Sequence, residues 1–348
     1  MKSKRLTSLS RGGGCGCKIE PKVLHEILKD TIKMPIPDEV IVGINTSDDA
    51  AVYQINENQV LIATTDFFTP IVDDPEHFGE IAATNAISDV YAMGGKPIFA
   101  LAIVCMPTKI LTTEQISKIL NGGKKICIKA GIPIVGGHTI DSEEPIYGLI
   151  VLGLASPENI RKNSNAKIGN KLILGKPIGM GIYSSALKRG QLPENYYSIM
   201  ISNATQLNSI GANSFVLSKS FAITDVTGFG LAGHAWEIAN GSKTDLQIFW
   251  NKVPILPGVK DLIKLGFVTG ASQRNWESFK DKVVINSSLK LDDRNLIFDP
   301  QTSGGLLIAV DSVYVDEILK EFKKNHYIAA EIGEIIERKT EFSKVFVE

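Results

Sequence analysis

The chain has 348 residues, of which 44% are hydrophobic and 22% charged, a composition typical of a soluble globular protein with enough apolar material for two domains. Its 37 basic and 38 acidic side chains leave a net charge of -1, which argues against a nucleic-acid or anionic-lipid partner. The longest apolar runs, at 98–106 and 147–155, fall far short of the roughly 20 residues of a membrane helix.

The first half of the chain alternates strand and helix patterns. In chain order we predict strands at 40–44, 50–55 and 59–68, a helix at 75–93, a strand at 96–106, a helix at 112–130, and strands at 132–135 and 145–154. Between residues 156 and 169 the pattern lapses into Pro, Asn, Ser and Lys. We place a domain boundary in this segment.

The second half restarts with a strand at 171–174 and a long helical region at 194–219. A strand at 221–225, a helix at 229–239, a strand at 246–250 and a final block of strand and helix at 306–347 follow. The halves share a short echo, because Ala63–Asp66 and Ala222–Asp225 each end a predicted strand with an aspartate. Duplication and chance both explain four similar residues.

The four cysteines do not form a disulfide framework in a chain of this length, so a reducing cytoplasm fits best. The basic first residues precede no apolar stretch, which makes them neither a secretion signal nor an anchor.

A glycine-rich segment, Gly12–Lys18, places two cysteines beside a lysine near the N-terminus. Glycine keeps the backbone mobile, so Cys15 can move toward a reactant and withdraw. The ammonium group of Lys18 favours the reactive thiolate. The alternative is a disordered terminus with two incidental cysteines. Cys17 we interpret as a dispensable accessory.

Acidic residues form the second informative pattern. Asp48 and Asp49 are adjacent, Asp66 and Asp225 end strands, and Asp89 lies on a helix four residues after Asn85. Oxygen ligands without His or Cys suit a hard cation, most often magnesium bridged to phosphate. Taken singly, each aspartate has a simpler explanation as a cap or turn residue.

Five glycine-containing segments were compared with known phosphate-binding patterns. Residues 169–176 fail as a Walker loop, and residues 228–233 fit the dinucleotide fingerprint without the acidic residue it requires. We interpret 225–230 as a ligand aspartate and a tight turn that leads into a helix N-terminus. Residues 136–139 are predicted to form a similar turn, and 299–305 a third loop.

Together these blocks resemble selenophosphate synthetase over nearly the whole chain. They are Arg11–Lys18, 45–53, 64–68, 82–89, 93–97, 136–139, 224–230 and 299–305, in the order of that family. The resemblance implies a reaction in which ATP, selenide and water give selenophosphate, AMP and orthophosphate. Related ATP-binding synthetases share the aspartate and glycine blocks but lack the leading Gly-Cys-Gly-Cys-Lys sequence.

The resemblance also implies the roles of individual residues. Cys15 and Lys18 match the essential catalytic positions, and Asp49, Asp66, Asp89 and Asp225 match the magnesium ligands. The nucleotide-contacting positions are Lys18, Thr46, Ser47, Asp48, Asp66, Asp89, Gly136, Gly137, His138, Thr139 and Ile140.

The implied architecture is an α+β, two-domain fold like that of aminoimidazole ribotide synthetase, with N-terminal sheets pairing in a homodimer. We expect a mobile catalytic loop at 1–20, an N-terminal ATP- and magnesium-binding domain at 21–157, and a C-terminal α+β domain at 158–348. A selenium-delivery protein is a further candidate partner.

Three other functions remain open at this stage. A ligase or kinase of the same superfamily would keep the aspartates without the Cys15 loop, and a redox sensor would keep the cysteines without needing five aspartates. A regulatory module would bind ATP and magnesium without turnover.

Overall fold

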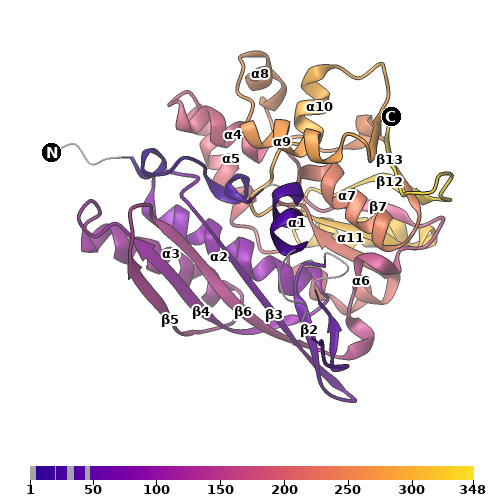
Figure 1. The fold of residues 1–348 in the computed structure, drawn as a ribbon, viewed down its shortest axis with the longest axis horizontal. Helices are drawn as coiled ribbons and strands as arrows, with labels where there is room; N and C mark the ends of the chain where they lie inside the picture. The colour runs from indigo at the N-terminus through magenta and orange to yellow at the C-terminus, as the bar shows by residue number, and fades with distance from the viewer. Residues whose placement is uncertain (1–4, 20, 30–34, 44–47) are drawn as a thin grey trace.

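The computed structural model describes residues 5–19, 21–29, 35–43 and 48–348, which build two α+β units, each on its own sheet (Figure 1). This agrees with the α+β class expected from the sequence. None of the described helices combines the length and apolarity needed to cross a lipid bilayer.

The N-terminal unit is a six-stranded sheet with the order β1-β2-β3-β6-β4-β5. Its pairs are antiparallel except for β4 and β5, which run parallel. Helices α2 and α3 lie along one face of this sheet (Figure 1). The strands are β1 Val40–Val42, β2 Ala51–Asn56, β3 Gln59–Phe68, β4 Lys96–Met106, β5 Ile134–Asp141 and β6 Ile146–Ala155; the helices are α1 Pro21–Lys29, α2 Pro75–Ala92 and α3 Thr113–Lys129.

The C-terminal unit is a seven-stranded sheet with the order β10-β13-β9-β12-β7-β11-β8. Strands β10, β13 and β9 run parallel to one another, and the other pairs are antiparallel. The strands are β7 Lys171–Leu174, β8 Ser220–Asp225, β9 Asp245–Ile248, β10 Val283–Ile285, β11 Leu306–Val310, β12 Ala330–Ile336 and β13 Val345–Val347. The helices are α4 Met180–Lys188, α5 Glu194–Ala204, α6 Ser214–Lys219, α7 Gly230–Gly241, α8 Val259–Lys264, α9 Gly270–Phe279, α10 Leu291–Ile297 and α11 Val315–Lys324.

Helix α2 joins the two units. It begins at Pro75, where the Asp74 side chain accepts the N–H of His77 as an N-cap. Most of its side chains are buried, because it packs on β3 and β6 on one side and on β8 and α5 of the C-terminal unit on the other. Polar residues on this buried helix therefore face the boundary between the two units.

Several predicted elements have the expected bounds, including the strands at 59–68, 96–106 and 171–174. The continuous helical region at 194–219 is wrong, because α5 ends at Ala204 and α6 begins at Ser214 after an intervening 3₁₀ turn. Helices α1, α4, α8, α9 and α10 and strand β10 were not predicted.

The predicted turn at 136–139 is also wrong, since these residues continue β5 in register with β4. Gly137 has a φ of 150°, and a Cβ there would lie 2.1 Å from the carbonyl oxygen of Ala102. Glycine at this position therefore allows close approach of two strands and does not mark a reversal of the chain.

Candidate active site

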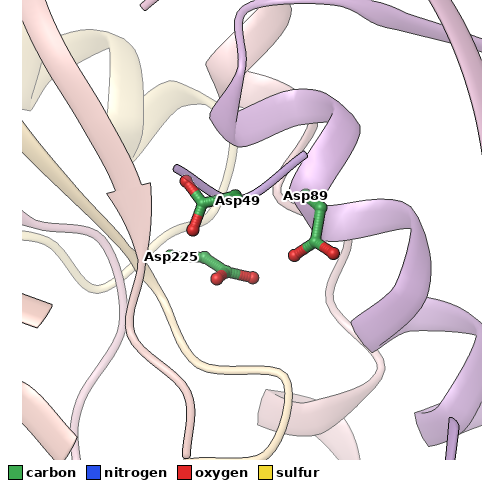
Figure 2. A group of neighbouring side chains, drawn as sticks. All are labelled: Asp49, Asp89 and Asp225. Carbon is green, nitrogen blue, oxygen red and sulfur yellow. The ribbon is translucent and has the colours of Figure 1, made fainter. Parts of the chain in front are cut away.

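Three aspartates from distant parts of the chain converge at the boundary between the two units. Asp49 precedes β2, Asp89 lies near the end of α2, and Asp225 ends β8. One carboxylate oxygen of each lies within 4.8 Å of the others. Figure 2 shows the three carboxyl groups gathered around a common space. The structure thus brings together three of the four aspartates that the sequence analysis matched to magnesium ligands.

Threonines hold two of these carboxylates in place. Thr64 donates to Oδ2 of Asp89 at 2.5 Å, and Thr224 donates to Oδ1 of Asp49 at 2.8 Å. The two threonines belong to the echoed segments of β3 and β8. Oδ2 of Asp49 and Oδ2 of Asp225 are buried and find no hydrogen-bond partner among the described residues. Buried oxygens of this kind normally have a partner, so the cluster presents unused ligand atoms.

Burial and mutual repulsion raise the pKa values of the cluster. For Asp49 and Asp89, burial raises the pKa most and the charge of Asp225 adds to it. Burial likewise raises the pKa of Asp225, while a hydrogen bond from Ser88 opposes the shift. A divalent cation would offset the repulsion, because it favours the ionised form of each carboxyl group.

The cluster opens into a cavity of about 280 Å³ that residues of both units line. Asp48, Asp66 and Lys18 also line it, as do Glu237 and His234. Nδ1 of His234 lies 2.9 Å from Oε2 of Glu237, and its ring stacks on Phe229. Glu237 carried no recognisable signal in the sequence, because nothing local marks it as facing the aspartates.

Asp66 lies beside the cluster but is not one of the three convergent carboxylates. Its Oδ2 accepts a hydrogen bond from Nδ2 of Asn85, and Oδ1 of Asn85 accepts from Sγ of Cys15 at 3.3 Å. The same Oδ1 accepts the N–H of Ser303 at 2.6 Å. Asn85 thus connects an acidic residue to the loop cysteine, a role that its helical spacing from Asp89 did not reveal.

Cys15 is buried in this conformation, with 1% of its surface exposed. Burial raises its pKa well above the ordinary value, and the charge of Asp66 adds to the shift, whereas Lys18 opposes it. Lys18 thus favours the thiolate, as expected from the sequence, but burial outweighs its effect on the Cys15 pKa in this conformation. The buried group is a thiol that donates to Asn85.

Lys18 lies at the rim of the cavity, near several of its acidic residues. The charge of Asp66 is the main cause that raises the Lys18 pKa, and burial opposes it. Lys18 also lines a narrow crevice that it shares with Cys15. The lysine therefore stays protonated and carries its charge to the position where cavity and thiol meet.

The glycine-rich segment packs closely against both units. Residues Gly14–Cys17 form a 3₁₀ turn, in which the N–H of Gly14 donates to the carbonyl of Thr69 and the N–H of Cys15 donates to Oγ1 of Thr302 at 3.1 Å. Gly14 has a φ of 56°, and a Cβ on it would lie 2.3 Å from Oγ1 of Thr302. Only glycine fits this position without displacing the turn.

The loop at 299–305 is held by buried hydrogen bonds and contacts the site through Ser303. Oδ2 of Asp299 accepts the N–H of Gly181 at 2.9 Å at the start of α4, and burial raises the pKa of Asp299 to about 8. The carbonyl of Ser303 accepts from Nζ of the buried Lys176 at 2.9 Å. This third glycine-closed loop positions Asn85 through the N–H of Ser303.

The nucleotide-contacting positions implied by the sequence fall in three groups. Thr46 and Ser47 lie outside the described residues. Asp48 lines the acidic cavity and accepts the N–H of Asn163 at 2.7 Å. Residues 136–140 lie on β5, at the edge of the sheet opposite to β1, and are solvent-exposed; within one chain they are not brought to the cavity.

Comparisons with known proteins match both units of the chain. The family described as "AIR synthase related protein, N-terminal domain" matches residues 47–155, and "AIR synthase related protein, C-terminal domain" matches residues 167–345. The chain is 53% identical to the selenide, water dikinase of Dechloromonas aromatica over 334 residues, which is 96% of each protein. It is 51% identical to that of Pseudomonas straminea over 329 residues, 94% of this chain and 92% of the relative.

Solved structures share the fold at lower identity. A chain in the crystal structure of a HypE–HypF complex has a TM-score of 0.67 at 18% identity, with 93% of this chain and 96% of that chain covered. Thiamine-monophosphate kinase from Stenotrophomonas maltophilia has a TM-score of 0.64 at 16% identity, with 93% and 94% covered. These likenesses establish the two-domain fold alone.

Proposed function

The chain belongs to the selenide, water dikinase family, and on this premise we propose how its described residues act in the reaction. The reaction converts ATP, selenide and water to selenophosphate, AMP and orthophosphate. The observation that carries our proposal is the convergence of Asp49, Asp89 and Asp225 beside the loop that bears Cys15 and Lys18. ATP occupies the acidic cavity, with its phosphates toward the aspartates.

A magnesium ion fits the aspartate cluster, because oxygen ligands suit a hard cation and two buried oxygens lack partners. Asp49, Asp89 and Asp225 would hold it, and Asp66 completes the acidic wall. When bound, the ion neutralises phosphate charge that would otherwise oppose the approach of an anionic nucleophile. Thr64 and Thr224 keep the carboxylates oriented before the ion binds.

Lys18 supplies a fixed positive charge beside the phosphate being transferred, since the acidic residues around it keep it protonated. Cys15, held by Asn85, carries or orients selenium at the mouth of the cavity. The closed glycine turn covers this position and excludes water while the first phosphoryl group moves. Because Cys15 is buried, the turn opens to admit selenide and closes again.

A homodimer accounts for the exposed strand β5. Its residues 136–140 lie far from the cavity of their own chain, so we assign their nucleotide contacts to a second copy. The outer face of the N-terminal sheet carries apolar side chains that pairing would cover, among them Phe67, which is 48% exposed, and Tyr53, which is 45% exposed. Sedimentation of Phe67→Glu against wild type tests this pairing, since a monomeric variant is expected.

The remaining parts of the proposal concern organisation and location. The boundaries 1–20, 21–157 and 158–348 separate the loop and the two domains. All four cysteines are free, which suits the reducing cytoplasm. A selenium-delivery protein is a further partner that would bring selenide to the loop.

AMP formation tests the activity directly. Purified protein is incubated with ATP and magnesium, with and without selenide, and AMP is followed by chromatography. Selenide-dependent AMP is expected, and Cys15→Ser is expected to lose it with the fold intact by circular dichroism. Full turnover of Cys15→Ser would overturn the role of Cys15, and AMP formation that ignores selenide would overturn the function.

A further inference from the structure

A second cavity, of about 400 Å³, adjoins the glycine turn and shares no described lining residue with the acidic one. Four basic side chains line it: Arg11, Lys188, Arg189 and Arg274. The hydroxyl groups of Ser184, Ser185, Thr269 and Thr302 add polar contacts, and no acidic side chain is among its described lining residues. We call it the basic cavity.

The basic cavity extends to the crevice that contains the reactive loop. Gly16, Ala271 and Arg274 line both it and the narrow crevice whose wall includes Cys15 and Lys18. Thr302, another of its lining residues, accepts the N–H of Cys15. The crevice itself measures only about 10 Å³, about the space of one water molecule. Within the described chain, the glycine turn is thus the barrier between basic cavity and thiol.

Charge separates the two approaches to Cys15. Asp48, Asp49, Asp66, Asp89, Asp225 and Glu237 line the acidic cavity. A small anion is repelled by that lining and attracted by the basic one, because a concave surface of one sign concentrates ions of the opposite sign. Selenide at neutral pH is the monoanion hydroselenide.

We propose that the basic cavity is the binding and entry site for hydroselenide, separate from the cavity that takes ATP. The inference rests on the proposed function and adds the route of its second substrate. Hydroselenide gathers among the basic groups and passes the glycine turn to reach Cys15.

The basic side chains also explain how the passage opens. Nζ of Lys188 donates to the carbonyls of Ser10 and Arg11 at 3.0 Å each, and Arg274 donates to the carbonyl of Gly16 at 3.1 Å. These bonds hold the turn closed. An anion is a stronger acceptor for the same donors than a neutral carbonyl oxygen. Binding of hydroselenide therefore loosens the turn at the moment when passage is needed.

Two measurements on a double variant, Arg11→Gln with Arg189→Gln, test the proposal. The two substitutions remove two positive charges from the cavity and leave the hydrogen bonds from Lys188 to the loop in place. A control pair, Lys264→Gln with Lys320→Gln, makes the same change of net charge at exposed sites outside the cavity. Thermal unfolding confirms that both variants fold.

The first measurement reads the charge of the cavity independently of catalysis. Cys17 is exposed and, with Arg11 and Arg274, lines the cleft adjoining the basic cavity. Its alkylation by anionic iodoacetate is compared with that by neutral iodoacetamide, using mass spectrometry. We expect the ratio of the two rates to fall about threefold or more in the double variant and to stay unchanged in the control.

The second measurement is the KM for selenide against the KM for ATP. We expect the double variant to raise the selenide KM about three- to tenfold, with the ATP KM and the kcat unchanged. An unaltered alkylation ratio, an unaltered selenide KM, or an equal rise of both KM values would overturn the proposal. Each of these outcomes leaves selenide-dependent AMP formation by wild type, and hence the proposed function, intact.

Discussion

Replacing Asp225 with asparagine should stabilise the metal-free protein while abolishing its activity. Two unit charges 4.8 Å apart repel by about 3.5 kcal/mol at an effective dielectric constant of about 20. Partial protonation relieves some of this repulsion, because the pKa values of Asp49, Asp89 and Asp225 are raised. We therefore expect Asp225→Asn to raise the free energy of unfolding in EDTA by about 2 kcal/mol.

The assay is urea unfolding followed by circular dichroism, in EDTA and in excess magnesium. Wild type should gain stability from magnesium, because an ion that binds only the folded state shifts the equilibrium toward it. Asp225→Asn should lose most of this gain. The exposed Asp261→Asn, which removes the same charge elsewhere, serves as the matched control and should resemble wild type in both buffers.

The pH dependence of the folding stability is a second test of whether the clustered aspartates repel one another. Because the folded pKa of each clustered aspartate is raised above its unfolded value, the folded state binds more protons, and stability in EDTA falls as pH rises from about 4 through the raised pKa values. The fall should be shallower in Asp225→Asn. If Asp225→Asn is less stable than wild type in EDTA, or if magnesium stabilises it as much as wild type, the reasoning is refuted.

Three further predictions concern the loop and its support. Gly14→Ala should displace the turn and make Cys15 as reactive toward iodoacetamide as Cys17. Gly16→Ala, whose added Cβ would lie 3.6 Å from its nearest neighbour, should leave Cys15 protected. Equal protection of Cys15 in both variants would contradict this packing. In wild type, the alkylation rate of Cys15 should be lower than that of Cys17 and should rise up to pH 9 without levelling, because burial raises the Cys15 pKa; a plateau near pH 8 would argue against it. Burial lowers the Lys176 pKa to about 7, so the stability of the fold grows as pH rises from 7 toward the unfolded pKa of this lysine. Relative to Lys176→Met, wild type should gain about 3 kcal/mol between pH 7 and 9.5 in urea unfolding, and parallel pH profiles would exclude this.

The strands that the sequence predicted best are those whose apolar pattern is set by burial within one sheet. Strands β3 and β4 lie in the middle of the N-terminal sheet, and both have the predicted bounds. The prediction of a turn at 136–139 was wrong because a pair of glycines usually indicates a turn, whereas here glycine lets β5 lie close to β4. The break between α5 and α6 was hidden by apolar residues that serve helices and turns alike.

The candidate site was predictable in its residue types and not in its connections. The motifs identified Cys15, Lys18 and the aspartates, because these residue types fit phosphoryl transfer. The link from Cys15 through Asn85 to Asp66 depends on a helix and a strand brought together by folding. The protonation of Cys15 likewise depends on burial, which exceeds the effect of the nearby Lys18.

By itself, the sequence determined the α+β class, the family and most of the groups that we propose for the chemistry, because these depend on local pattern and residue identity. Only the tertiary structure decided that Asp49, Asp89 and Asp225 form the compact cluster, that Asn85 accepts a hydrogen bond from the thiol, and that basic side chains line a cavity next to the glycine turn. The physical reason is distance: repulsion, desolvation and hydrogen bonding act over a few ångströms in space, and residues hundreds of positions apart reach that range only when the two units pack together.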